Sequence, residues 1–170
     1  MKKGFTLVEI LVAVMIVTLL VVMAVSMYEK TVEKSRMAEV RILLKEIYEA
    51  KIRTLDSMDR ENFSYDLFGF EALDVSLGCI NPTTGARLTR CTGSEAYTKD
   101  FKYVLYSPAS GVPNAVCAVR RKGDNVGVAF LYVGDQDATD GEKFFCNDGP
   151  GGGSCDAYVL DSSGTAWCTL

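Results

Sequence analysis

A single carboxylate stands inside a long apolar run near the N-terminus. The chain begins Met1-Lys2-Lys3-Gly4-Phe5-Thr6-Leu7-Val8-Glu9, and after Glu9 no charged residue follows until Glu29. A charged side chain at the centre of a bilayer costs about 2.5 kcal/mol or more, so an acidic residue in such a run is a functional hypothesis by default. Glu9 is therefore the first candidate site residue, and its charge requires a cationic partner wherever water is excluded.

Six cysteines form the second candidate set, and all of them lie beyond residue 78. An even number of cysteines in a small exported domain is typical of disulfides. Since no two are spaced as C-x-x-C, zinc binding and thioredoxin-like chemistry are not expected. Six cysteines allow fifteen connectivities. The pairing suggested by the shortest loops is Cys79–Cys91 and Cys146–Cys155, which leaves Cys117–Cys168.

An acidic stretch between two predicted strands is the one candidate metal site. Asp135, Asp137 and Asp140 precede Gly141, and spaced carboxylates before a glycine resemble a calcium loop. The spacing differs by one residue from the EF-hand pattern, and the downstream glutamate is missing. We therefore favour an acidic turn, with calcium as the alternative, and we expect no other cofactor.

The composition excludes several classes of function. The chain contains no histidine, which removes the commonest general base and the commonest metal ligand. Without a nucleophile–base pair, and with cysteines that look structural, we do not expect an enzyme. The net charge of -4 gives no indication of nucleic acid as a partner.

One long helix must position Glu9. The uncharged run from Ile10 to Tyr28 is about the length that crosses a bilayer, roughly 20 residues. Lys2 and Lys3 precede it, which predicts a cytoplasmic N-terminus and an exported remainder. Neither glycine nor proline occurs from Phe5 through Phe68. A helix from Phe5 to about Met58 would be roughly 80 Å long. A small domain cannot cover that length, so its first half must be buried in lipid and then in other copies of itself.

The second half of this helix is amphipathic. From Glu29 onward charges of both signs recur at helical spacing, while Val40, Leu43, Leu44 and Ile47 form an apolar stripe. We therefore divide the chain into residues 1–4, residues 5–28 as the apolar half of the helix, residues 29–58 as its amphipathic half, and a head of residues 59–170.

The head is expected to contain an antiparallel sheet. Residues 59–100 look irregular, with a turn signal at 81–85, and short runs rich in aromatic and β-branched residues follow. Strands are predicted over residues 101–106, 115–120, 126–133, 143–146 and 157–160. Short strands with tight connections favour an antiparallel sheet, one side of which the amphipathic helix would cover. The predicted fold class is α+β.

The N-terminal residues carry a family resemblance. Lys3-Gly4-Phe5-Thr6-Leu7-Val8-Glu9 resembles the processing motif of type IV prepilins and type II secretion pseudopilins: a basic leader, a Gly-Phe junction, a glutamate four residues later and a long apolar run. The resemblance is close over about thirty residues and general over the next thirty. It implies the ladle-shaped pilin fold, with the hydrophobic half of the helix protruding from the head.

The resemblance also implies partners and roles. A membrane prepilin peptidase would remove residues 1–4 by cutting between Gly4 and Phe5, and would methylate the new amine of Phe5. Glu9 would lie in the core of a filament, where that amine could pair with it on the same or a neighbouring subunit. The other implied partners are further copies of the chain, minor pilins and an inner-membrane assembly platform. The proline that many members carry near the end of the apolar run is replaced here by Val25-Ser26-Met27.

Three other readings compete with a type IV pilus subunit, which would pass from the bacterial inner membrane into an extracellular filament. One is a pseudopilin in a periplasmic secretion filament, and three disulfides in an elaborated head favour the pilus over it. Another is a secreted binding domain whose signal peptide either stays uncleaved or is cut conventionally, with Ala24-Val25-Ser26 as the small-residue cleavage site. Glu9 within the apolar run and the uninterrupted helical pattern argue against it. The last of the three is an enzyme.

Overall fold

The structure is a computed structural model that describes residues 6–57, 69–105, 115–123, 126–134 and 143–147. The chain divides into two compact units, Met1–Glu39 and Val40–Leu170.

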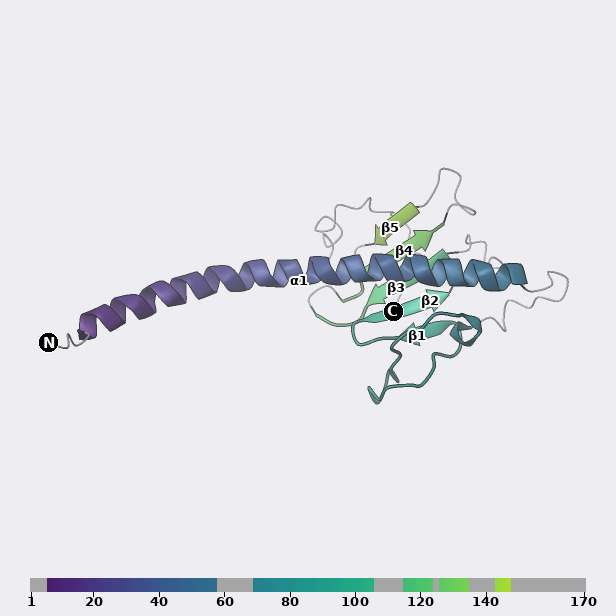
Figure 1. Cartoon of the computed structure of the whole chain (residues 1–170), viewed down its shortest axis with the longest axis horizontal. Coiled ribbons are helices and arrows are strands. Elements are labelled where there is room, and N and C mark those ends of the chain that lie inside the picture. Colours follow the sequence, from purple (N-terminus) through teal and green to yellow (C-terminus); the bar gives the residue numbers. More distant parts are fainter. Residues whose placement is uncertain (1–5, 58–68, 106–114, 124–125, 135–142, 148–170) are drawn as a thin grey trace. The chain divides into compact units, whose positions relative to one another are not determined.

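Helix α1 spans Leu7–Ser57 and runs through both units (Figure 1). It begins and ends within two residues of the predicted limits. Its 51 residues contain no glycine or proline, so no position removes a main-chain donor or adds the flexibility that would interrupt the helix.

In the second unit, α1 packs its apolar stripe on the sheet. Val40, Leu44 and Ile47 are at most 1% exposed, as the stripe predicted. Tyr48 meets Tyr132 edge to face, with ring centroids 5.3 Å apart. This part of the helix therefore supplies one layer of the core.

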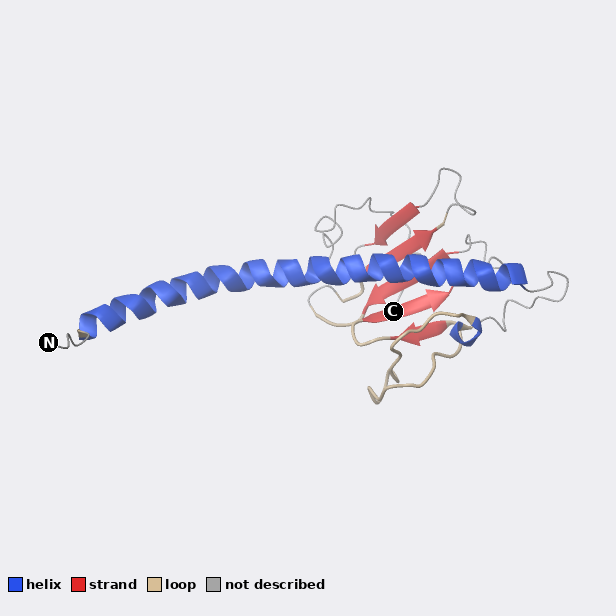
Figure 2. Cartoon of the chain, viewed as in Figure 1, coloured by secondary structure: helices blue, strands red, loops and turns tan. Residues whose placement is uncertain are grey.

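Five antiparallel strands form the other layer (Figure 2). Their order in the sheet follows the chain, which makes a simple meander in which each strand pairs with the next. They are β1 (Glu95–Tyr97), β2 (Phe101–Leu105), β3 (Ala115–Arg120), β4 (Ala129–Val133) and β5 (Lys143–Asn147). A helix and an antiparallel sheet confirm the predicted α+β class.

The strands differ from the predictions in two places. The first, β1, lies in the stretch predicted to be irregular, as does a short 3-10 helix at Phe70–Ala72. The predicted strand 126–133 begins only at Ala129, because Gly127 has a positive φ of 89° and donates its N–H to the Arg120 carbonyl in the hairpin turn. The strand predicted at 157–160 lies outside the described residues.

Strands β3 and β4 are buried on both faces of the sheet, since every residue of each strand is buried. The register places Val116, Phe130 and Tyr132 on the face that Tyr48 of α1 contacts. A cluster of buried residues occupies the opposite face, called here the second face. Its members are Ala115, Cys117, Val119, Ala129, Leu131 and Val133.

A polar cluster fastens the short edge strand β1 to β2. Lys102 Nζ lies 2.9 Å from Glu95 Oε1, and the Tyr97 hydroxyl donates to Glu95 Oε2. The hydrogen bond from Lys102, with a second one from Tyr97, lowers the pKa of Glu95. Acceptance by Glu95 raises the pKa of Tyr97 in turn.

The contribution of Glu95 to the stability of the head should be lost in acid. Its folded-state pKa is lowered, so its contribution is present above the unfolded-state pKa of about 4.3 and is lost as pH falls through the folded-state value. We expect the urea midpoint to fall less between pH 7 and pH 3 in Glu95→Gln than in the wild type. Glu46→Gln, at an exposed position of α1, is the matched control and should follow the wild type. Equal losses in Glu95→Gln and wild type would contradict the role of this cluster.

Candidate functional site

The first turn of α1 is closed by a reciprocal pair of hydrogen bonds. The Glu9 main-chain N–H donates to Thr6 Oγ1 at 3.3 Å. In return, the Thr6 N–H and hydroxyl donate to Glu9 Oε2 at 3.5 and 3.4 Å. This is a capping box, in which a threonine before the helix and a glutamate three residues later satisfy each other's main-chain donors. The Thr6-x-x-Glu9 spacing in the sequence is the signal that could have predicted it.

The cap fixes where the Glu9 carboxylate lies. It is held at the positive end of the helix dipole, where a negative side chain is favoured by about 0.3–1 kcal/mol. A carboxylate can accept about four hydrogen bonds. The N–H and hydroxyl of Thr6 both donate to Oε2 of Glu9, so acceptor positions remain for a cation. The group is therefore oriented toward the N-terminal end of the chain and remains able to bind a positive charge.

The apolar half of α1 offers a continuous exposed surface. Every residue from Thr6 to Val25 is exposed, including Leu7 at 80% and Val22 at 73%. This helix is long and apolar enough to cross a membrane. Its one hydroxyl between Leu7 and Val25, that of Thr18, donates to the Met15 carbonyl at 2.8 Å. The segment thus satisfies its own polar groups, as a helix in lipid must.

Charged residues appear where this surface ends. Arg36 and Glu33 form an ion pair at 2.6 Å, one turn apart on α1. The Thr31 hydroxyl donates to the Met27 carbonyl. The change from apolar to charged side chains therefore occurs within one uninterrupted helix.

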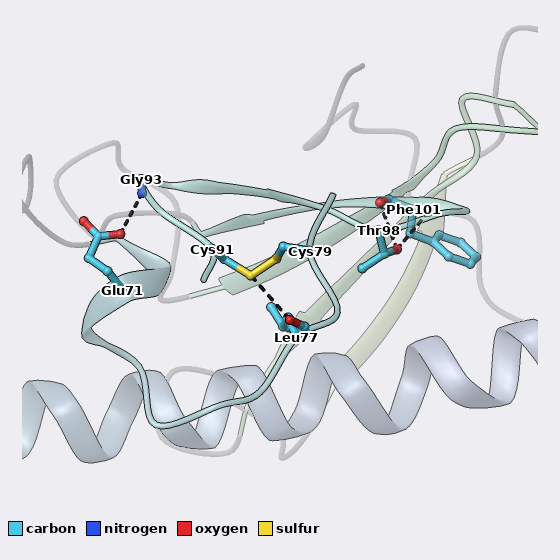
Figure 3. Close-up of a disulfide and its surroundings, with 7 residues drawn as sticks. All are labelled: Glu71, Leu77, Cys79, Cys91, Gly93, Thr98 and Phe101. Carbon is cyan, nitrogen blue, oxygen red and sulfur yellow. Dashed lines mark hydrogen bonds between the residues drawn. A yellow bond between two sulfur atoms is a disulfide. The ribbon is translucent and has the colours of Figure 1, made fainter. Parts of the chain in front are cut away.

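In the head, the predicted Cys79–Cys91 disulfide is present and closes an exposed loop (Figure 3). The two Cα atoms are 5.7 Å apart. The predicted turn inside the loop is confirmed, since Asn81 Oδ1 accepts from the N–H groups of Thr83 and Thr84. Just beyond Cys91, the Gly93 N–H donates to the Glu71 carboxylate at 2.7 Å. The loop is thus tied at its base both covalently and by hydrogen bonds.

The other predicted site residues have different outcomes. Cys117 and Cys146 are both disulfide-bonded. Across residues 6–57, 69–105, 115–123, 126–134 and 143–147, no group of three metal-ligating side chains occurs. The remaining predicted site residues lie outside the described ranges: Gly4, Phe5, Asp135, Asp137, Asp140, Cys155 and Cys168.

Comparison with known proteins agrees with the N-terminal geometry. Residues 1–25 match the family model described as the prokaryotic N-terminal methylation motif, which is the signature of type IV pilins and pseudopilins. No curated protein and no solved structure matches the chain. The predicted resemblance is confirmed for this segment. The motif belongs to a structural family, implies processing by a prepilin peptidase, and fits anchoring in the inner membrane before assembly.

Proposed function

We propose, from an N-terminus that carries the pilin signature, that the chain is a structural subunit of a type IV pilus. It would be inserted in the inner membrane, cut by a prepilin peptidase between Gly4 and Phe5, methylated on the Phe5 amine and assembled into a filament. Minor pilins and an inner-membrane assembly platform would be its further partners. The observation that carries the proposal is an acidic residue at the capped start of a helix whose first half, from Leu7 to Val25, is apolar and exposed throughout.

The exposed surface explains the membrane stage and the filament stage together. Side chains such as Leu11, Val14 and Leu19 are 52–65% exposed in the single chain. Burying apolar area is favourable by about 25 cal/mol per Å². Before assembly, lipid would cover this surface, and in the filament the same surface on other copies would cover it. Because both environments are apolar, transfer between them needs a polar interaction to fix the position of each helix.

Glu9 would supply that interaction. Cleavage after Gly4 would create a new amine one residue before Thr6, beside the end of the helix toward which the carboxylate is held. An amine on Phe5 of the same or a neighbouring subunit would pair with Glu9. A subunit out of register would leave the carboxylate without its cation in an apolar core, at a cost of several kcal/mol. We therefore assign Glu9 to the specification of axial register.

A pseudopilin of a type II secretion machine would use the same N-terminal chemistry. The disulfide-bonded cysteines of the head favour the pilus, because covalent links suit a filament exposed to proteases and shear. Typical disulfides add about 2–4 kcal/mol of stability each.

Mass spectrometry of the mature protein tests the proposed processing. The expected N-terminal peptide begins with N-methylated Phe5, because the cut follows Gly4 and the same enzyme modifies the new amine. Deletion of the prepilin peptidase in the producing cell is the control, and should leave residues 1–4 in place. A mature chain that starts at Met27 would replace the filament proposal with a conventionally secreted protein.

Electron microscopy tests the choice between pilus and pseudopilus. Surface filaments whose main subunit is this chain would support the pilus. Detection of the methylated chain only in the periplasm, together with loss of secreted proteins on its deletion, would support the pseudopilin.

A further inference from the structure

The loop closed by the Cys79–Cys91 disulfide is a basic surface on an acidic protein. Residues 80–90 contain Arg87 and Arg90 and no acidic residue, whereas the whole chain has a net charge of -4. Every residue from 82 to 90 is exposed, including Leu88, which lies between the two arginines in the sequence and is 43% exposed. Neither arginine forms an ion pair with a side chain that the structure describes. The loop therefore offers one apolar side chain and two cations that can bind carboxylates.

This loop, called here the basic loop, is held in one shape by its own contacts (Figure 3). The Leu88 N–H donates to the Cys79 carbonyl at 2.9 Å, and Ile80 pairs with Arg87 in an isolated antiparallel bridge. The Ile80 N–H also donates to the Tyr97 carbonyl at 2.7 Å, which ties the loop to β1. A loop that is already ordered loses less entropy when it binds a partner.

A cleft of about 340 Å³ lies beside the basic loop. Its volume is at the lower end of the range of binding pockets, about 300–1,000 Å³. Phe70 and Leu73 are among its apolar lining residues, and Arg90 lines it from the loop. The other charged residue of the lining, Asp74, is paired with Arg53 of α1 at 2.9 Å. The cleft and the loop together fit an apolar side chain that has a carboxylate beside it.

An exposed face of α1 carries groups of this kind. Ile42, Glu46 and Glu49 follow one another at spacings of four and three residues, which places them on one face of the helix. Ile42 is 70% exposed, and both glutamates are exposed. Among the described residues, neither glutamate forms an ion pair, whereas the nearby cations Lys45 and Arg53 have interactions of their own. This face, called here the α1 ridge, thus has an apolar residue and two carboxylates available to a partner.

We propose that the α1 ridge of one copy docks on the basic loop and its cleft in a second copy of the chain. Ile42 enters the cleft, and Glu46 and Glu49 meet Arg87 and Arg90. The complementary charges are the reason for choosing a second copy as the partner: two carboxylates on one surface match two guanidinium groups on the other. Hydrogen bonds between such charged groups are stronger than those between neutral groups, and arginine often binds a carboxylate through two of them at once.

The contact is heterologous, because the ridge and the basic loop are different surfaces of the same chain. Each copy can therefore offer its ridge to one neighbour and its loop to another, and heterologous contacts that do not close into a ring produce helical filaments. The inference rests on the proposed assembly into a filament and adds a contact between heads to the pairing at Glu9. Complementary charges also exclude wrong partners, so the contact would select copies of this chain.

Charge reversal in the producing cells tests the contact. Arg87→Glu/Arg90→Glu and, separately, Glu46→Arg/Glu49→Arg should each reduce the yield of sheared filaments several-fold, because like charges would then face each other. The chain with all four substitutions should recover most of the yield, since the pairs are restored with their signs exchanged. A wild-type yield from either double variant, or no recovery in the chain with all four changes, would overturn the proposal.

Lys99→Glu/Lys122→Glu is the matched control for the loop variant. Both lysines are exposed and belong to neither surface, and their reversal changes the net charge by the same amount. This control should keep the wild-type yield. A loss as large as that of the loop variant would show that net charge limits assembly, and the docking of ridge on loop would be rejected.

Photo-cross-linking locates the contact without any change of charge. Benzoylphenylalanine in place of Leu88 in the full-length chain should give dimers on illumination of the cells, and trypsin should release peptide 88–90 linked to 42–45 or 46–51. Dimers linked elsewhere, or no dimers, would overturn the contact, while filaments of the wild type would leave the proposed function standing. A wild-type chain that forms no filament at the surface or in the periplasm would overturn both.

Discussion

Filaments are expected to be lost when Glu9 is replaced by alanine. The cleaved subunit would still insert in the membrane, since the apolar residues of α1 are unchanged, but no carboxylate would be present to pair with the Phe5 amine. Filament yield by shearing and electron microscopy measures assembly. Mass spectrometry of the same cells checks that the Phe5 terminus forms normally. A normal yield of filaments from this variant would refute the register role.

The capping box makes a sharper version of this experiment available. Glutamine at position 9 can still accept from the Thr6 N–H, because the capping-box pattern admits glutamate or glutamine, but it carries no charge. Thr6→Val removes the hydroxyl with little change in shape and keeps the carboxylate. If pairing with an amine is the function of Glu9, then Glu9→Gln should fail to assemble and Thr6→Val should form filaments.

If Glu9→Gln formed filaments and Thr6→Val did not, the role of Glu9 would be that of a helix cap alone. Loss of a cap typically destabilises a helix by about 0.5–2 kcal/mol. A helix that continues through Ser57 would tolerate that loss by fraying only its first turn. Filaments from Glu9→Gln together with none from Thr6→Val would therefore contradict the pairing with the amine.

The long helix could be predicted because its signals are local and cumulative. Many consecutive residues without glycine or proline, an uncharged run of bilayer length and an apolar stripe at helical spacing all point to the same element. Each of β2, β3 and β5 likewise carries aromatic or β-branched residues in a short run. The N-terminal motif adds a pattern specific enough to indicate a family from only a few residues.

The features that could not be predicted depend on contacts between distant residues. Strand β1 has no strand-like pattern of its own, and its three residues are held by the Lys102–Glu95 ion pair and by pairing with β2. The face of the sheet to which each cysteine belongs follows from strand register. Register requires knowing where each strand begins, and the hairpin before β4 shifted that start by three residues. The cap at Thr6 was local and could have been predicted from its spacing.

Replacement of Ile47 by alanine is expected to destabilise the head strongly. Ile47 is 0% exposed where α1 packs in the core, and truncation of a buried isoleucine typically costs about 2–5 kcal/mol. A domain of this size is stable by only about 5–15 kcal/mol, so the loss is a large share of the total. Urea unfolding of the full-length protein in detergent micelles, followed by near-ultraviolet circular dichroism, measures the shift in midpoint.

Ile42 offers a matched control on the same helix. It is 70% exposed, and Ile42→Ala makes the same chemical change with the same gain in helix propensity. Surface substitutions usually change stability by no more than about 0.5 kcal/mol, so the midpoint should hardly move. The difference between the two variants therefore isolates burial on the sheet. Equal midpoints would mean that α1 does not pack in the core through Ile47, and the stripe of Val40, Leu44 and Ile47 would then have to be assigned to contacts between subunits.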